Sequence, residues 1–146
     1  IAEAFGMNVC YFSTSGTGHC KDYPCLSLEE LLKVSDIVSI HAPLNERTNR
    51  LIGKEQLALM KPTAYLVNVG RGAIIVEEDL AEAVDNGIIA GAGIDVFVQE
   101  PIPEDHPYLK MQHPERMRLT PHIAWASIEA RRRLIDIMAD NIRKGW

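Results

Sequence analysis

Short apolar runs alternate with amphipathic segments along most of this 146-residue chain. The apolar runs are bounded by glycine, proline or polar residues, which is typical of buried strands. They predict strands at residues 7–12, 36–42, 64–69, 89–96 and 117–120. Apolar residues at helical spacing predict helices at residues 28–34, 54–60, 77–87 and 126–146, and residues 1–5 resemble the last turn of a helix capped by Gly6.

The helix ends carry matching signals. Ser27 precedes the helix 28–34 and Glu30 stands three residues later, which is the pattern of a capping box. Strands and helices therefore alternate, and the strands are apolar throughout instead of alternating with polar residues. This pattern indicates a parallel sheet covered by helices on both faces. We predict an α/β protein with a doubly wound parallel sheet.

Arg71 is the first candidate for function, because a charged residue follows an apparently buried strand. It stands between Gly70 and Gly72, directly after the strand 64–69. The planar guanidinium suits a carboxylate, and flanking glycines allow a ligand to approach the backbone closely. Since ligands of parallel sheets bind beyond the carboxyl ends of the strands, we expect Arg71 to lie in the binding crevice.

Three further residues follow later strands: Asp95, Glu100 and His122. His122 can exchange a proton near neutral pH, and a carboxylate beside it would hold the imidazole in one tautomer and favour its charged form. Each of these residues alone is more simply a solvated charge or part of a turn. Their joint position at successive strand ends favours a single site.

Composition and charge exclude several classes of function. The net charge of −5 argues against nucleic acid or an anionic membrane as a partner, and no apolar run is long enough to cross a membrane. Cys10, Cys20 and Cys25 are odd in number, so we expect free thiols and a reducing, cytoplasmic location. His19 lies next to one of them, but the spacing matches no zinc pattern, so we expect no metal.

Four segments together resemble the nicotinamide-binding domain of the D-isomer-specific 2-hydroxyacid dehydrogenases. They are SDIVSIHAPLNERTNRLI at 35–52, MKPTAYLVNVGRGAIIVEEDLAEAV at 60–84, IAGAGIDVFVQEPIP at 89–103 and LTPHIAWAS at 119–127. The resemblance implies a Rossmann-like fold and NAD or NADP as the cofactor. It also implies an NAD(P)-dependent oxidoreductase acting on a CH–OH group, which interconverts a D-2-hydroxy acid and a 2-oxo acid by hydride transfer.

The resemblance further implies a catalytic set of Arg71, Glu100 and His122. Arg71 would bind the carboxylate and carbonyl of the substrate. His122 would be the general acid in reduction and the general base in oxidation, with Glu100 orienting its imidazole. Glutamate at position 100 argues against a formate dehydrogenase of this superfamily, which would carry glutamine there. The cofactor would contact Asp95, which would hold the nicotinamide carboxamide, and also Ala42, Pro43, Thr48, Val69, Gly70, Arg71 and His122.

One departure from the family concerns the phosphate loop. The motif Gly-x-Gly-x-x-Gly does not occur, and the SGTG at 15–18 follows a later strand and opens no helix. We expect residues 1–146 to be an NAD(P)-binding domain that is N-terminally truncated at its first strand, with the substrate domain absent, and inactive alone. Without that central strand, we expect the strands 7–12 and 36–42 to lose their link to the others.

A second departure concerns the choice of cofactor. The acidic residue usual at the end of the second strand is replaced by Ser13, Thr14 and Ser15. That carboxylate normally binds the ribose hydroxyls of NAD and repels the extra phosphate of NADP. Hydroxyls and backbone amides can accept a phosphate instead. Ser13 and Thr14 are therefore candidate cofactor contacts, and the choice between NAD and NADP stays open.

Two functions other than catalysis also stay open. A cofactor-sensing corepressor of the same fold can carry the same arginine, glutamate and histidine, and the chain could be an inert fragment. For an enzyme, the substrate is a small 2-oxo or 2-hydroxy acid that the sequence does not specify further. The resemblance implies a homodimer with no nucleic-acid or membrane partner.

Overall fold

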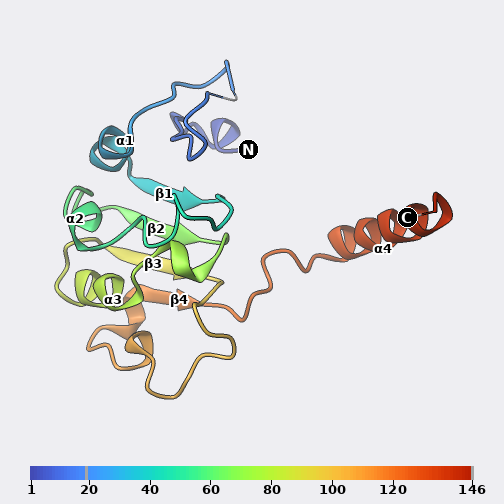
Figure 1. The fold of residues 1–146 in the computed structure, drawn as a ribbon. Helices are drawn as coiled ribbons and strands as arrows, with labels where there is room; N and C mark the ends of the chain where they lie inside the picture. The colour runs from blue at the N-terminus through green and yellow to red at the C-terminus, as the bar shows by residue number, and fades with distance from the viewer. Residues whose placement is uncertain (19, 146) are drawn as a thin grey trace.

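A parallel sheet forms the centre of the computed structural model, which describes residues 1–18 and 20–145 (Figure 1). Within this part of the chain the sheet has four strands in the order β1–β2–β3–β4. They are β1 (Ile37–Ile40), β2 (Tyr65–Asn68), β3 (Gly91–Ile94) and β4 (Met117–Leu119). Every neighbouring pair is parallel, so the predicted Rossmann-like α/β fold is confirmed.

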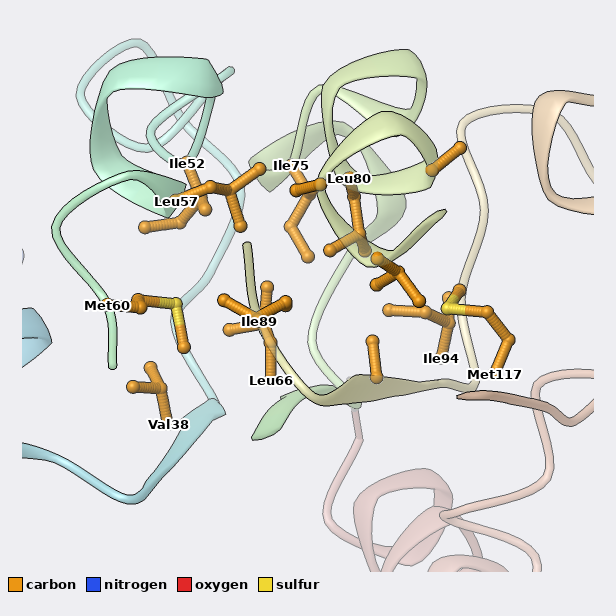
Figure 2. Packing of buried hydrophobic residues seen from close by; sticks show 14 of the residues in the cluster. Val38, Ile52, Leu57, Met60, Leu66, Ile75, Leu80, Ile89, Ile94 and Met117 are labelled. Carbon is orange, nitrogen blue, oxygen red and sulfur yellow. The ribbon is translucent and has the colours of Figure 1, made fainter. Parts of the chain in front are cut away.

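Helices cover one face of this sheet. They are α1 (Leu28–Val34), α2 (Lys54–Leu57) and α3 (Glu77–Asp85), of which α2 contacts both of the others. Figure 2 shows the core between α2, α3 and the sheet, with Leu66 of β2 facing Leu80 and Leu57. These side chains are almost fully buried, and their removal from water is the main stabilising contribution to the fold.

The opposite face of the sheet is open along its first two strands. Ile37 of β1 is 51% exposed and Tyr65 of β2 is 52% exposed. The prediction that helices cover both faces is therefore wrong for the described part of the chain. Helix α4 (Ile128–Arg143), which follows β4, extends away from the sheet after an irregular segment and buries none of its residues (Figure 1).

Local signals at the helix ends match the sequence. The Ser27 hydroxyl accepts the N–H of Glu30, and the Glu30 carboxylate accepts the N–H of Ser27, so the predicted capping box is present. Gly6 and Gly87 adopt left-handed conformations after the preceding helical turns, with φ of 77° and 68°. The short 3₁₀ turns are η1 (Glu3–Phe5), η2 (Gly72–Ile74), η3 (Pro107–Leu109) and η4 (Pro114–Arg116).

The segment 7–12 does not form the predicted strand. Tyr11 makes one isolated parallel bridge with Cys25, and the rest of the segment has no strand partner in the described structure. The segment 36–42, in contrast, contains β1 and pairs with β2 along its length. The prediction that both segments lose their link to the others is therefore wrong for 36–42, and only 7–12 lies outside the sheet. An apolar run becomes a strand only where a neighbour supplies hydrogen bonds.

Candidate active site

The turn after β2 carries Arg71 and is braced by a buried amide. The side chain of Asn68 accepts the N–H of Gly70 at 3.0 Å and donates to the carbonyl of Arg71 at 2.9 Å. Asn68 is 1% exposed, so these bonds lie in the interior, where they fix the turn firmly. The Arg71 side chain itself is exposed, and its Nη1 donates to the carbonyl of Gly70 at 2.8 Å. Most of its guanidinium donors are therefore free to bind an anion.

His122 and Glu100 form the pair that the sequence predicted. Nδ1 of His122 lies 2.8 Å from Oε2 of Glu100, and both side chains are a little over one-third exposed. The other carboxylate oxygen of Glu100 accepts the N–H of Phe97 at 3.0 Å. The hydrogen bonds from His122 and Phe97 lower the pKa of Glu100, so Glu100 is ionised at neutral pH.

Asp95 fixes the turn that carries His122. His122 has a φ of 55°, in the left-handed region that side chains other than glycine rarely adopt. The buried carboxylate of Asp95 accepts the hydroxyl of Thr120 at 2.6 Å and the N–H groups of Ile123 and Ala124 at 2.9 Å each. Burial raises the pKa of Asp95, but these three hydrogen bonds outweigh burial and bring the pKa below its ordinary value.

A cleft of about 460 Å³ lies at the carboxyl ends of β1 and β2. Its walls come from the two segments that follow these strands: His41, Ala42, Pro43, Leu44, Val69, Gly70 and Arg71. Four predicted cofactor residues, Ala42, Pro43, Val69 and Gly70, therefore line one cleft together with Arg71. Small side chains and open backbone suit a flat ring or a ribose, and the arginine suits an anion. These residues fit part of a dinucleotide, whereas a glycine-rich cradle for its pyrophosphate does not occur in the sequence.

Thr48, Ser13 and Thr14 lie outside this cleft wall. The Thr48 side chain is fully buried, and its hydroxyl donates to the carbonyl of Pro43 at 2.7 Å, so it braces the loop that lines the cleft. Ser13 and Thr14 begin a turn in which the Ser13 hydroxyl donates to the carbonyl of Thr17. Nη1 of Arg47 donates to the carbonyl of Ser15 at 3.1 Å and links this turn to the loop of Thr48. Contacts of Ser13, Thr14 and Thr48 with a cofactor stay predictions.

A second hollow and the search for metal ligands point to no other site of this kind among the described residues. A larger hollow of about 640 Å³ lies between α1 and α2, far from the strand ends, and its lining includes no histidine, cysteine or arginine. Among residues 1–18 and 20–145, no group of three histidine, cysteine or acidic side chains could hold a metal ion. His19 lies outside the described residues. No described helix has the length and hydropathy of a membrane span.

Sequence reasoning missed three residues that shape the site. Asn68 and Thr120 stand at the ends of strands, and their side chains hold the turns of Arg71 and His122. His41 lines the cleft beside Ala42, and its Nε2 lies 2.8 Å from the Ser39 hydroxyl. A buried polar residue at the end of an apolar run was the available signal for Asn68, because such a residue needs a hydrogen-bond partner.

The comparisons with known proteins agree with this geometry. A family model described as "D-isomer specific 2-hydroxyacid dehydrogenase, NAD binding domain" matches residues 1–124. A glyoxylate reductase of Korarchaeum cryptofilum is 44% identical over 144 residues, which cover 97% of this chain and 42% of that protein.

Solved structures show the same likeness. An NADPH-dependent glyoxylate/hydroxypyruvate reductase of Sinorhizobium meliloti, in complex with citrate, is 31% identical with a TM-score of 0.84, over 97% of this chain and 43% of that one. D-lactate dehydrogenase of Aquifex aeolicus, complexed with NAD and lactic acid, is 30% identical with a TM-score of 0.83, over 97% of this chain and 46% of that one. The chain thus spans less than half the length of these relatives. It belongs to the D-isomer-specific 2-hydroxyacid dehydrogenase family and corresponds to the NAD-binding domain, as the resemblance predicted.

Proposed function

We propose that this chain is the NAD(P)-binding part of an oxidoreductase that interconverts a D-2-hydroxy acid and a 2-oxo acid. The observation that carries the proposal is the His122–Glu100 pair at 2.8 Å, which lies at the same edge of the sheet as the exposed guanidinium of Arg71. A proton donor and a fork of anion-binding donors are the groups that reduction of a 2-oxo acid requires. The family match and the named activities of the relatives support the same reaction.

The proposed roles of His122, Glu100 and Arg71 follow from which of their atoms are available to a substrate. Nδ1 of His122 faces Glu100, so Nε2 is the nitrogen available to a substrate. The ionised Glu100 stabilises the imidazolium, and Nε2 delivers its proton to the carbonyl oxygen. Arg71 binds the carboxylate of the substrate and stabilises the negative charge that develops on the carbonyl oxygen. NADH or NADPH, when bound, would supply the hydride to the carbonyl carbon. In oxidation Nε2 takes the proton of the hydroxyl group, and the oxidised cofactor would accept the hydride.

We infer a small 2-oxo acid such as glyoxylate or hydroxypyruvate as the substrate, because those names recur among the relatives. We propose either NAD or NADP as the cofactor. Arg47 beside the turn of Ser13 and Thr14 adds positive charge for a phosphate. A homodimer in a reducing cytoplasm, with no nucleic-acid or membrane partner, is also part of the proposal. The three free cysteines support the reducing location, and the net charge of −5 supports the lack of a nucleic-acid or membrane partner.

We propose further that residues 1–146 form an NAD(P)-binding domain that does not turn over substrate by itself. The absence of a glycine-rich loop from the sequence and the open face of the sheet support this. Titration of the chain with NADH and with NADPH, followed by nicotinamide fluorescence, tests cofactor binding directly. Binding of cofactor without turnover is the expected result for the chain alone, and turnover of glyoxylate by it would contradict this proposal.

His122→Asn in a protein with the complete domains tests the chemistry. Loss of the general acid should lower kcat for glyoxylate reduction by about 100-fold or more, with NADPH or NADH binding retained. The control is His113→Asn, because His113 also faces a glutamate, Glu115, at 3.3 Å but lies away from the strand ends. Equal rates for the two variants would refute the role of His122.

The same assay separates the enzyme from a cofactor-sensing corepressor. Tight cofactor binding together with negligible turnover by a protein with the complete domains would favour the sensor. The three named relatives are reductases and a dehydrogenase, so the comparisons favour the enzyme.

A further inference from the structure

A second glutamate–histidine pair lies behind the site, at the start of α3. Oε2 of Glu77 lies 3.1 Å from Nε2 of His106, and these side chains are only 11% and 4% exposed. Nδ1 of His106 accepts the N–H of Tyr108 at 3.3 Å. Because Nδ1 is an acceptor, Nε2 carries the ring proton and donates it to Glu77. The mechanism above makes no use of this pair.

The other carboxylate oxygen of Glu77 connects the pair to Glu100. Oε1 of Glu77 accepts the N–H of Val98 at 3.0 Å. The preceding N–H, that of Phe97, donates to Glu100 at the same distance. Two glutamates therefore bind two consecutive amides from different directions. Glu77 binds the peptide between Phe97 and Val98, here called the 97–98 peptide, and Glu100 binds the peptide before it; the two peptides share Phe97.

The turn of Arg71 packs against the same peptide. A Cβ placed on Gly72 would lie 2.0 Å from the carbonyl carbon of Phe97 and 2.4 Å from the nitrogen of Val98, so the backbones are in direct contact. The ring of Phe97 packs edge-on against His106, with centroids 5.8 Å apart. A shift of the 97–98 peptide would therefore move both the backbone next to Arg71 and the anchor of Glu100.

We propose that Glu77 and His106 are positioning residues, whose buried pair fixes the 97–98 peptide and through it places Glu100 against His122 and supports the turn of Arg71. The inference rests on the proposed function only in treating Glu100 and His122 as the pair that handles the proton. The contacts themselves involve no cofactor or substrate. Neither residue touches the reacting atoms, so each acts through the backbone that it holds.

Glu77→Gln tests the proposal, with Glu78→Gln as the matched control. The amide has one acceptor oxygen, so it cannot accept from both Val98 and His106 and leaves one buried donor facing another. Glu78 is an exposed glutamate on the same turn of α3, and its replacement removes the same charge. The readouts are the titration of the Glu100 carboxyl by NMR and hydrogen exchange at the amides of Phe97 and Val98.

The expected result for Glu77→Gln is a rise of about 0.5 to 1 pH unit in the titration midpoint of Glu100, because its hydrogen bond from Phe97 weakens. Exchange should become about tenfold faster at both amides. Glu78→Gln should change neither quantity. An unchanged titration of Glu100, with faster exchange at Val98 alone, would overturn the proposal and leave Glu77 as a local helix contact.

His106→Asn provides a second route to the same answer. Asparagine keeps an acceptor for the N–H of Tyr108 and removes the contact with Glu77, so the shift in the Glu100 titration should recur. The double variant should not add the two shifts, because both remove one interaction. If Glu77→Gln does not fold, the Glu100 titration of His106→Asn decides the question. A circular-dichroism melting curve then checks that this variant is folded. Since no step needs cofactor or substrate, failure of the proposed function would leave this measurement intact.

Discussion

The turn that carries His122 depends on one buried carboxylate, that of Asp95. His122 stands on a turn with positive φ, and Asp95 holds that turn through Thr120, Ile123 and Ala124. A residue in the left-handed region persists only where its surroundings over-determine it. The predicted contact of Asp95 with the nicotinamide carboxamide stays a prediction. The three hydrogen bonds give Asp95 a second role that the sequence did not suggest.

Asp95→Asn should destabilise this turn. Asparagine keeps one acceptor oxygen, but its amide group faces an N–H that the carboxylate had bound, and the charge that strengthened all three bonds is lost. We expect the free energy of unfolding to fall by about 2 kcal/mol. Urea unfolding measures it, with Asp105→Asn in the exposed loop as the control. Equal stability of the two variants would contradict the anchoring role.

Low pH should remove the stabilisation that the ionised carboxylates of Asp95 and Glu100 provide. The pKa values of Asp95 and Glu100 are lowered in the folded chain, so both carboxylates stabilise it above their unfolded pKa values of about 4. That stabilisation is lost as the pH falls below about 4 and through the folded pKa values. The free energy of unfolding should therefore drop steeply in this range, and less steeply for Asp95→Asn. If the free energy of unfolding of the original chain and of Asp95→Asn changed with pH to the same extent, Asp95 would make no such pH-dependent contribution.

The backbones of the turn of Arg71 and the loop of Glu100 are in contact at Gly72, so a shift of one should displace the other. The glycine is needed for lack of space and not for its φ, since a Cβ would overlap the 97–98 peptide. The segments 64–72 and 97–100 come from successive strand ends of one sheet. Parallel order brings such ends together, and the close backbone contact then makes their positions interdependent.

Gly72→Ala should separate these two segments. The added methyl group forces the 97–98 peptide to move, at an expected cost of about 1–3 kcal/mol in the free energy of unfolding, and should also shift the Glu100 titration. Gly93→Ala in β3 is the control, because its Cβ would meet only Val67 Cγ2 at 3.9 Å. Thermal unfolding measures the difference in stability between Gly72→Ala and Gly93→Ala. A Gly72→Ala chain as stable as Gly93→Ala would show that the loops can separate freely.

The molecule exposes surfaces that isolated domains normally cover. The outer edge of β1 has no strand partner within the described residues, and one face of the sheet is open at Ile37 and Tyr65. Helix α4 extends from the body with an apolar stripe that includes Ile128, Ile135 and Ile142 in solvent. Unpaired strand edges and exposed apolar faces favour association with another chain.

We therefore expect the chain to associate in solution. Light scattering should detect dimers or larger species at micromolar concentrations. Ile37→Lys should weaken this association, because a charge on an edge strand opposes pairing. Ile88→Lys, at an exposed position after α3, should have little effect. A monomer at every concentration would contradict the importance of this edge.

Much of the fold could be predicted from the sequence because its signals are local. Apolar runs, the Ser27–Glu30 capping box and the glycines at positions 6 and 87 act within a few residues. The corresponding helices and four of the five predicted strands formed. The observed strands are shorter than predicted, since hydrogen bonding ends before the apolar run does. The pairing of His122 with Glu100 was predicted from their place after successive strands, and the geometry agrees.

The sequence by itself determined the residue types at the strand ends and the parallel order that gathers them. Tertiary structure decided which apolar runs pair: 7–12 does not, because no neighbouring strand supplies its hydrogen bonds. It also decided that Asp95 holds the turn of His122 by binding the N–H of Ile123, and that Glu77 meets His106. These contacts join residues that are 28 and 29 positions apart. Such contacts depend on where folded backbones meet, and no local pattern of polar and apolar residues specifies that meeting.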